Sequence, residues 1–554
     1  MPWWKLDAFG LCVVVGFVVA AVALSILSVQ WGWFSGWWEL ALWLGLGGAC
    51  LVGAALQVEA PKQGIALSIW ATRRHVDAYN IGETANAETA DQGLYLGSFA
   101  GEGEPLRLRY KGEKHLLVFG PPGSSKSMGL AVPNIALLPR SMIVIDPKGQ
   151  LAAITERSRA ELGRTIVLNP FGVFADQWPH MESAGWNPLL QLDPKSHDFA
   201  GDAVCIADAL IDRAAGGGGN SVFFENSAEN LLTALIMWEC FTKSGKPGLP
   251  VIWQQYMRTD KPSLRAIREE LGRPTLYDQK KQPVSGLLHT LKCMAECDNY
   301  AIRTTGGRLY SRLTDENSKA TSVQDVIETV LSGTRFLDDP RIGYDMAHGG
   351  AIDFGALHHE MTTIYLILPV HELQAQAKWL RMFVSLALRG LYKNPPTSGA
   401  TLPPVLFILD EFANLGRLQE IIKALGAARD YSIQLFMVLQ SLSQLKAHYE
   451  KEWPLFFAGS GAVAAFASRD FETAEQLSKL CGNREERVQT ETNSGGTVTP
   501  QSIPLARPED LMRLERGQTV NFIEPCPWPV VARAPVYAQL DFCEDLAPNP
   551  YYRG

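Results

Sequence analysis

A glycine-rich octapeptide, GPPGSSKS, carries the residue types that bind phosphate. In such a loop, backbone N–H groups and the N-terminus of the next helix surround the β-phosphate, a lysine neutralises the β and γ oxygens, and the next hydroxyl holds Mg²⁺. Lys126 and Ser127 stand at those last two positions, so the octapeptide predicts binding of ATP with Mg²⁺. The predicted nucleotide-binding residues are Gly120, Pro121, Pro122, Gly123, Ser124, Ser125, Lys126 and Ser127.

Ser125 departs from the pattern G-x-x-x-x-G-K-[ST], which has glycine immediately before the lysine. We expect its β-carbon to crowd the phosphate or to strain the loop, which puts the rate of hydrolysis in question. A Gly/Ser-rich turn that holds a lysine is the alternative interpretation of the octapeptide taken alone.

Paired acids follow an apolar run at residues 405–409. Ligands of an open parallel sheet lie at strand ends, so we expect Asp410 to hold Mg²⁺ through water and Glu411 to orient and deprotonate the attacking water. The predicted metal ligands are therefore Ser127 and Asp410. A strand followed by a solvated acidic turn is the alternative, and the coexistence with the phosphate loop favours catalysis.

Polar residues also follow two other strand-like runs. Gln440 directly follows the run 432–439, and from there its amide can hydrogen-bond both the γ-phosphate and the attacking water. A plain polar residue at a strand end is an equal alternative on spacing alone. Asp146 and Lys148 follow the run 141–145, and a structural contact between them is as good an interpretation as contact with a ligand.

Short apolar runs separated by helix-compatible sequence predict a mainly parallel sheet that positions these residues. A long stretch with helical patterns and almost no strand signal predicts an inserted all-α domain. The predicted strands are residues 116–119, 141–145, 165–168, 363–368, 405–409 and 434–439. The predicted helices of the insertion are residues 199–211, 227–241, 263–271, 284–295 and 322–334.

Two segments outside the predicted sheet and insertion, residues 58–113 and 489–523, also carry secondary-structure signals. Residues 58–113 predict a lead-in with a helix near 68–79 and a strand at 93–99. The polar, glycine-containing residues 489–499 predict a mobile loop, followed by a last strand of the sheet near 519–523.

Two apolar stretches near the N-terminus predict a transmembrane hairpin. Residues 8–29 contain no ionisable group and exceed the roughly 20 residues that a spanning helix needs, and residues 40–56 are a shorter second candidate. The segment between them lacks Lys and Arg, whereas Lys62, Arg73 and Arg74 follow the second stretch, so both termini are expected in the cytoplasm. A cleaved signal peptide is the alternative, but the apolar run continues past its small-residue site.

Bulk composition leaves nucleic-acid binding open. An apolar content of 47% with 19% charged residues excludes a disordered or collagen-like chain, and 554 residues suggest about three domains. The chain has 50 Lys and Arg against 58 Asp and Glu, which gives a net charge of −8. Any contact with nucleic acid therefore needs a local basic lining.

Several motifs, in this order, resemble the type IV secretion coupling ATPases of the TraG/VirD kind. The resemblance covers residues 69–537 and rests on GPPGSSKS at 120–127, VIDPKGQ at 144–150, LNPFG at 168–172, WNPL at 186–189, LDEFANLGRL at 409–418 and VLQSLSQL at 438–445.

This resemblance implies an α/β fold, in which a RecA-like P-loop motor domain with an inserted all-α domain follows the transmembrane hairpin. It implies a homo-hexamer in the bacterial inner membrane, in contact with membrane lipid. It also implies that relaxase-bound single-stranded DNA, effector proteins or both are passed to the inner-membrane components of a type IV secretion channel. Arg429 falls where the family's proposed trans-acting arginine lies, and an exposed arginine at a helix end is its alternative. The predicted catalytic residues are Glu411, Lys126, Gln440 and Arg429.

The expected domains are the transmembrane hairpin (1–57), the linker and lead-in (58–113), the first part of the motor (114–189), the inserted all-α domain (190–345), the second part of the motor (346–540) and a C-terminal tail (541–554). An ATP-hydrolysing coupling motor is the leading hypothesis. The alternatives are a non-hydrolysing receptor scaffold, with nucleotide as a structural ligand or absent, and a DNA-partitioning motor of the same P-loop class.

Overall fold

The computed structural model describes residues 68–84, 93–99, 104–212, 219–243, 261–280, 282–314, 320–396, 402–492 and 495–551. Both predicted transmembrane spans lie outside these ranges. Within the ranges, no helix combines the length and the apolar character that a bilayer crossing requires.

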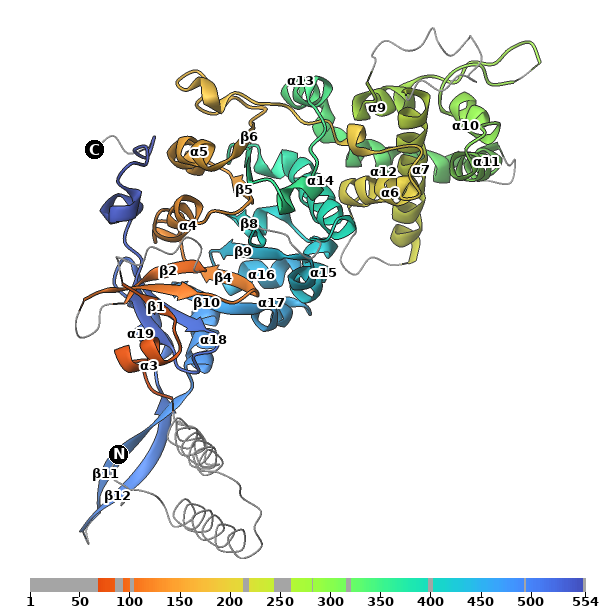
Figure 1. Cartoon of the computed structure of the whole chain (residues 1–554). Helices are drawn as coiled ribbons and strands as arrows, with labels where there is room; N and C mark the ends of the chain where they lie inside the picture. Colours follow the sequence, from red (N-terminus) through yellow and green to blue (C-terminus); the bar gives the residue numbers. More distant parts are fainter. Residues whose placement is uncertain are drawn as a thin grey trace, which may run out of the picture. The chain divides into compact units, whose positions relative to one another are not determined.

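A mixed sheet of twelve strands forms the centre of the described chain (Figure 1). Its strand order is β1-β3-β2-β14-β13-β10-β4-β9-β8-β5-β7-β6. The strands are β1 (Gly82–Glu83), β2 (Leu94–Phe99), β3 (Leu106–Tyr110), β4 (His115–Phe119), β5 (Met142–Asp146), β6 (Arg164–Leu168), β7 (Thr362–Ile367), β8 (Val405–Leu409), β9 (Ile433–Leu439), β10 (Ser460–Phe466), β13 (Gln518–Ile523) and β14 (Val530–Arg533).

The expectation of a mainly parallel sheet needs correction. The strands from β10 to β6 pair in parallel, whereas those from β13 to β1 pair antiparallel. Helices connect the parallel strands, but short segments join β2 to β3 and β13 to β14, and short connections favour antiparallel pairing.

The six predicted motor strands are confirmed to within one residue at each end, and β2 and β13 confirm the strands at 93–99 and 519–523. The last of these does not end the sheet, because β14 follows it. Strand β10 was missed because its sequence, SGAVAAF, is rich in small residues that do not favour strands. All seven of its residues are buried between β4 and β13, so the tertiary structure overrides the local preference.

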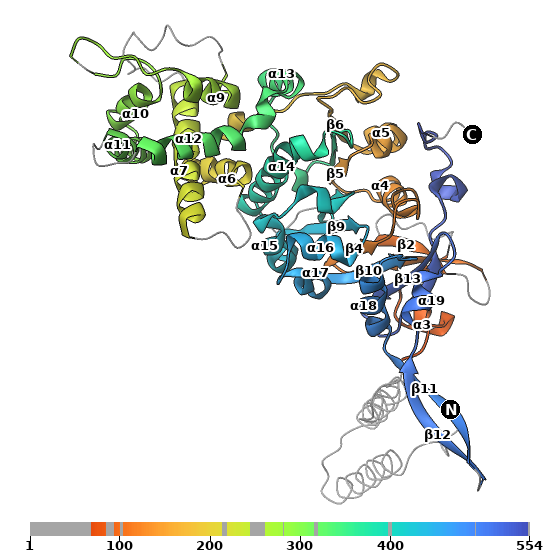
Figure 2. The ribbon, with the colours of Figure 1, turned by 180° about the vertical axis from the view of Figure 1, so that it is seen from behind.

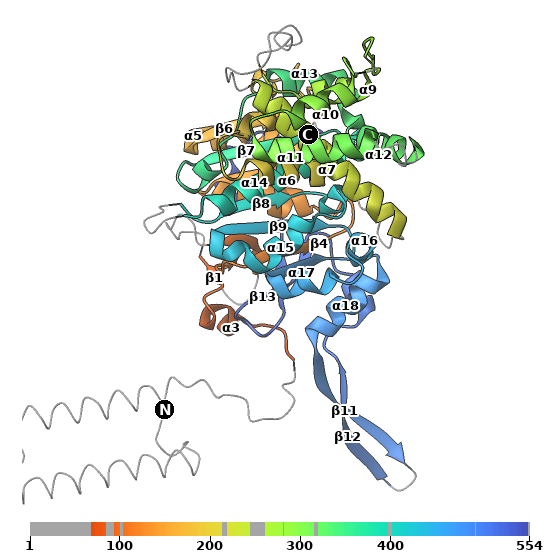
Figure 3. The same cartoon turned by 90° about the vertical axis from the view of Figure 1, so that its right-hand side faces the viewer.

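Residues 489–492 and 495–499, which the sequence predicts to be a mobile loop, are strand. Strands β11 (Asn483–Thr492) and β12 (Gly495–Pro504) pair in antiparallel register over ten positions and form a separate ribbon that projects from the main sheet (Figure 3). The sequence of the ribbon is polar along its length, so it lacks the alternation of apolar and polar residues that identifies a half-buried strand.

Helices cover both faces of the sheet (Figure 1 and Figure 2). Alternate residues along each strand point to opposite faces, so β4 contributes Leu116 and Val118 to one apolar cluster and Leu117 and Phe119 to the other. The first cluster includes α4 (Val132–Leu137) and α5 (Gln150–Leu162). The second includes α14 (Leu373–Lys393), α15 (Gln419–Ala427), α16 (Leu442–His448) and α17 (Trp453–Gly459).

The long stretch between β6 and β7 is helical, as predicted, and holds α6 (Phe199–Leu210), α7 (Gly219–Lys243), α9 (Leu264–Gly272), α10 (Leu287–Ala295), α11 (Tyr300–Thr314), α12 (Ala320–Gly333) and α13 (Pro340–His348). Helix α11 was missed because two adjacent glycines interrupt its pattern. Gly306 has a packing role there, since a β-carbon on it would lie 2.3 Å from Cβ of Met294 in α10. The remaining helices are α3 (Arg73–Ala78), which confirms the helix expected near 68–79, α18 (Phe471–Cys481) and α19 (Pro508–Met512).

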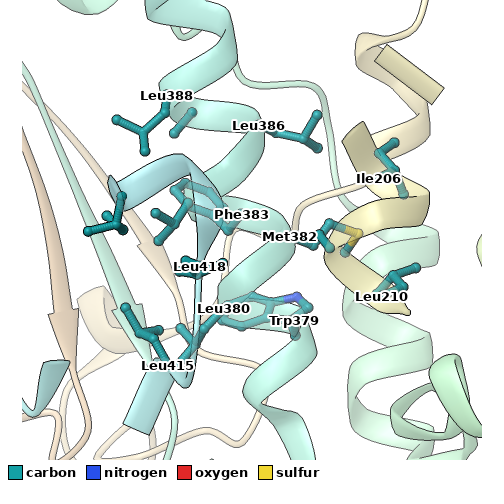
Figure 4. Close-up of a cluster of buried hydrophobic side chains, with 14 of the residues drawn as sticks. Ile206, Leu210, Trp379, Leu380, Met382, Phe383, Leu386, Leu388, Leu415 and Leu418 are labelled. Atoms are coloured by element: carbon teal, nitrogen blue, oxygen red, sulfur yellow. The ribbon is translucent and has the colours of Figure 1, made fainter. Parts of the chain in front are cut away.

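Helix α14 packs between the sheet and the inserted helices (Figure 4). Met382 lies on the side that faces Ile206 and Leu210 of α6, whereas Phe383 lies on the side of Leu418. All of these side chains belong to one continuous apolar cluster. The sheet and the inserted helices are therefore joined through a shared apolar core rather than through a flexible linker.

We predict that Phe383→Ala destabilises the protein by about 3–5 kcal/mol, because Phe383 is fully buried and its truncation leaves a cavity. Phe471→Ala is the matched control, since Phe471 is 57% exposed, and we expect it to change stability by less than about 1 kcal/mol. Thermal unfolding of the full-length variants measures both changes. Equal losses in the two variants would contradict the shared core.

Candidate nucleotide-binding site

The parallel strands bring the candidate residues to one edge of the sheet. Phe119 at the end of β4 pairs with Leu439 at the end of β9, and Leu409 at the end of β8 pairs with Ile145 of β5. The residues that follow these four strand ends are the phosphate loop, Gln440, the pair Asp410 and Glu411, and the segment that contains Asp146 and Lys148.

The phosphate loop is hydrogen-bonded to the sheet where it begins and has free space around Gly123 where it turns. The amide of Gly120 donates to the carbonyl of Leu439, at 3.0 Å, which ties the loop to β9. A β-carbon on Gly120 would lie 2.6 Å from Oγ of Ser124 and 3.1 Å from the Phe466 ring, so a larger residue there would force these side chains to shift. Gly123 has a φ of +79° with no atom near its missing β-carbon, which leaves open space where the loop turns.

Ser125 lies in the left-handed region, with a φ of 69°. A non-glycine residue in this conformation is strained by about 1–2 kcal/mol, so the strain expected from the sequence is present in the backbone. The next residues begin a helix whose first turn, Ser127–Ala131, is a π-turn that continues into α4. The loop therefore keeps its form even though serine replaces the usual glycine.

The two predicted metal ligands lie in contact. Oγ of Ser127 is 3.0 Å from both carboxylate oxygens of Asp410 and donates to them. Burial raises the pKa of Asp410, and the nearby Lys126 ammonium opposes that shift. A hydroxyl and a carboxylate at one point are the hard oxygen donors that Mg²⁺ prefers, so the pair fits this ion.

Lys126 is buried, with 7% of its surface exposed, and has no hydrogen bond or ion pair with any residue that the structure describes. Oγ of Ser124 is likewise buried without a partner among the described residues. The carboxylate of Asp410 is near enough to interact with this ammonium electrostatically but forms no ion pair with it. A buried ammonium without an ion pair or hydrogen bond is costly, so this arrangement fits an anionic ligand such as a phosphate chain.

Glu411 and Gln440 contact each other directly. Nε2 of Gln440 donates to Oε2 of Glu411, at 3.0 Å. Glu411 is half-buried and has a φ of 60°, a strained conformation that clusters at functional sites. The contact orients the carboxylate that we expect to act as a base, and the contact expected between Gln440 and the γ-phosphate stays a prediction.

Backbone amides just before and inside α5 bind the carboxylate of Asp146. Its carboxylate accepts from the backbone amides of Lys148, at 3.3 Å, and Ala152, at 2.9 Å. Burial raises its pKa to about 7, to which the nearby charge of Asp410 contributes. The side chain of Lys148 is exposed and forms no ion pair with the described residues. The structural contact of Asp146 is thus with the backbone of Lys148 and not with its ammonium.

Arg159 is a buried residue that the sequence analysis did not single out. Its guanidinium donates to the carbonyls of Leu138 and Arg140 at the far end of α4, at 2.6 Å each, and to Oγ1 of Thr363 in β7. It therefore braces the helix that starts at the phosphate loop. The only sequence signal was a basic residue on an otherwise buried helix face.

Arg429 is not at this edge. It precedes β9, on the 3₁₀ turn Ala428–Tyr431, and its Nε donates to Oε2 of Glu113, at 2.9 Å, just before β4. The seven residues of β9 span about 3.3 Å each, which puts Arg429 roughly 20 Å from Gln440. Its guanidinium cannot reach the phosphate loop of its own chain.

Comparisons with known proteins agree with this geometry. Residues 71–550 match the family of type IV secretory system conjugative DNA transfer proteins. The chain is 25% identical to the conjugal transfer protein TraG of Agrobacterium fabrum (strain C58 / ATCC 33970), over 80% of this chain and 63% of TraG. It is 24% identical to the protein VirD4 of the same organism, over 78% of this chain and 58% of VirD4. The chain thus spans about three fifths of the length of these relatives.

A similar fold is found in the plasmid coupling protein TrwB. Its complex with a non-hydrolysable ATP analogue has a TM-score of 0.56 and 15% identity, over 86% of this chain and 96% of TrwB. Its complex with ADP and Mg²⁺ has a TM-score of 0.54 and 16% identity, over 76% of this chain and 85% of TrwB. At this level of identity, the likeness shows the α/β fold with its large mixed sheet.

We predict that Ser125→Gly stabilises the protein by about 1 kcal/mol, because glycine adopts a positive φ without strain. Gly123→Ala is the matched control. It has a positive φ and open space around its β-carbon, so it should lose about 1 kcal/mol through backbone strain alone. Calorimetric unfolding of the two variants checks the signs, and a loss of stability in Ser125→Gly would contradict the strain at this position.

Proposed function

The chain belongs to the family of type IV secretory system conjugative DNA transfer proteins, and from this premise we propose that it is a membrane-anchored P-loop ATPase that drives substrate into a secretion channel. The observation that carries the proposal is the phosphate loop, with its buried and unpaired Lys126 next to the contact between Ser127 and Asp410. The TrwB complexes with an ATP analogue and with ADP and Mg²⁺ support it by likeness of fold.

The residues at the edge have separate roles in this proposal. Lys126 neutralises the phosphate oxygens, while Ser127 and Asp410 hold Mg²⁺. ATP with Mg²⁺, when bound, supplies the phosphoryl group that water attacks. Glu411 accepts the proton of the attacking water at its carboxylate, and Gln440 keeps that carboxylate in place through its amide.

We assign Arg429 to the site of a neighbouring subunit. The guanidinium lies at the opposite end of β9 from its own phosphate loop, so contact with a γ-phosphate requires a second copy of the chain. Its ion pair with Glu113 is exposed on both sides, and an exposed pair contributes little, so Arg429 can exchange this partner during assembly. A closed ring, which we propose to be a homo-hexamer, supplies such a neighbour to every site.

The substrate and the location rest on the family and on the sequence pattern. We propose relaxase-bound single-stranded DNA, effector proteins or both as substrates, and the channel's inner-membrane components as partners. The two apolar stretches at 8–29 and 40–56 are the proposed anchor in the bacterial inner membrane, with both termini in the cytoplasm. A non-hydrolysing receptor scaffold is the second candidate, favoured by the strained Ser125.

Mixing two inactive variants of the full-length protein tests the shared site. We predict that Lys126→Ala and Arg429→Ala each lower ATP hydrolysis by about 10³-fold or more, whereas an equimolar mixture recovers a measurable part of the rate. Recovery is expected because a mixed ring places the intact arginine of one variant against the intact loop of the other. No recovery would mean that Arg429 does not act in trans. Arg157→Ala, at an exposed position on α5, serves as the control.

The dependence of hydrolysis on protein concentration distinguishes the motor from the scaffold. For a ring motor, the rate per subunit rises steeply with concentration in the presence of single-stranded DNA, and Glu411→Gln abolishes it while ATP still binds. The scaffold hypothesis would be favoured over the motor if the wild type and Glu411→Gln were equally inactive under assembly conditions while Ser125→Gly hydrolysed ATP.

A further inference from the structure

A strap formed by residues 537–551 crosses from the antiparallel part of the sheet toward the phosphate loop, past α4 and α5 (Figure 1 and Figure 2). Arg107 of β3 anchors it, since one guanidinium nitrogen lies 3.1 Å from both carboxylate oxygens of Asp541. The same guanidinium lies over the ring of Phe542, 4.5 Å from its centroid, and the edge of that ring meets Tyr95 of β2. The strap is thus fixed to the sheet before it reaches the site.

The far part of the strap contacts helix α5, the segment just before it and the helical turn that starts at Ser127. The amide of Ala547 donates to the carbonyl of Ile154 in α5. Nδ2 of Asn549 lies 3.3 Å from Sδ of Met128, the residue directly after the Mg²⁺ ligand Ser127. The hydroxyl of Tyr551 donates to the carbonyl of Lys148, at 2.7 Å. These contacts bridge the segment after β4 and the segment after β5.

Two side chains of the strap have unused binding capacity. A thioether sulfur is a weak acceptor, so the amide of Asn549 gains little from Met128 and can exchange it for a better partner. The ring of Tyr551 meets Phe174 edge-to-face, with centroids 5.3 Å apart, yet 54% of the residue is exposed. A largely exposed aromatic ring and an exchangeable amide are groups that can recognise a nucleobase.

The position of these groups follows from how a nucleotide sits on a phosphate loop. The phosphates lie on the loop and on the helix that starts at Ser127, so the nucleoside must extend along a surface beside that helix start. The strap supplies such a surface, because Asn549 contacts the helix at its second residue. The phosphate loop by itself offers no side chain that distinguishes one base from another.

We propose that Tyr551 and Asn549 bind the nucleoside of the bound nucleotide, Tyr551 by stacking on the base and Asn549 by hydrogen bonding to its polar edge. This inference rests on the proposed nucleotide binding at the loop. It assigns the strap to recognition of the nucleoside, in addition to its role in holding the two segments together.

Binding of ATP and of inorganic tripolyphosphate, each with Mg²⁺, separates recognition of the nucleoside from recognition of the phosphates. Isothermal titration of the full-length protein should give about tenfold weaker ATP binding for Tyr551→Ala, because a stacked base typically contributes that much. Asn549→Ala should weaken ATP binding by roughly five- to tenfold, because it removes a hydrogen bond to the base. Binding of tripolyphosphate should be unchanged in both variants. Tyr551→Phe, which keeps the ring and loses the hydrogen bond to Lys148, should bind ATP like the wild type.

Two outcomes would overturn the inference while the proposed function stands. The first is that Tyr551→Ala binds ATP as the wild type does. The second is that binding of ATP and of tripolyphosphate weakens equally, which would mean that the strap only supports the loop. If Tyr551→Ala fails to fold, Asn549→Ala decides by the same comparison. A wild type that binds neither ligand would overturn the proposed function as well.

Discussion

The parallel register of four neighbouring strands, β4, β9, β8 and β5, determines where every residue of the candidate site at this edge lies. Each of these strands is buried on both faces, so a shift by one residue would exchange the side chains of the two apolar clusters. The register is therefore specified by the whole core. It brings Ser127 within 3.0 Å of Asp410, although 283 residues separate them in the sequence.

The core also supports the unfavourable features of the site. Ser125 and Glu411 have positive φ angles, and Lys126 is buried without an ion pair or hydrogen bond among the described residues. Each of these features costs free energy in the folded chain, and each persists because the surrounding packing fixes it. Bound phosphate and Mg²⁺ would offset the electrostatic part of this cost, which is why the arrangement is suited to a ligand rather than to stability.

The site is connected to distant parts of the chain on both faces of the sheet. On one face, α14 shares an apolar cluster with the inserted helices, so a displacement of the insertion must alter the packing behind β8 and β9. On the other face, Arg159 braces α4, and the strap ties the starts of the two helices to β2 and β3. Of the candidate residues, Arg429 lies apart, at the opposite end of β9, and for this reason we propose that a neighbouring subunit uses it.

The sequence by itself determined the local elements, and the tertiary structure decided which of them meet. Runs such as HLLVF and VLFIL identify strands because a buried parallel strand is continuously apolar, and the octapeptide identifies a phosphate loop because few other sequences combine glycine, lysine and serine in that order. The Ala-rich β10, the polar ribbon of β11 and β12, and the glycine-interrupted α11 lack such local patterns, since neighbours or cross-strand pairing stabilise them. Contacts such as Gln440 with Glu411, Arg159 with α4 and Tyr551 with Lys148 depend on register and packing over long separations, which no local pattern encodes.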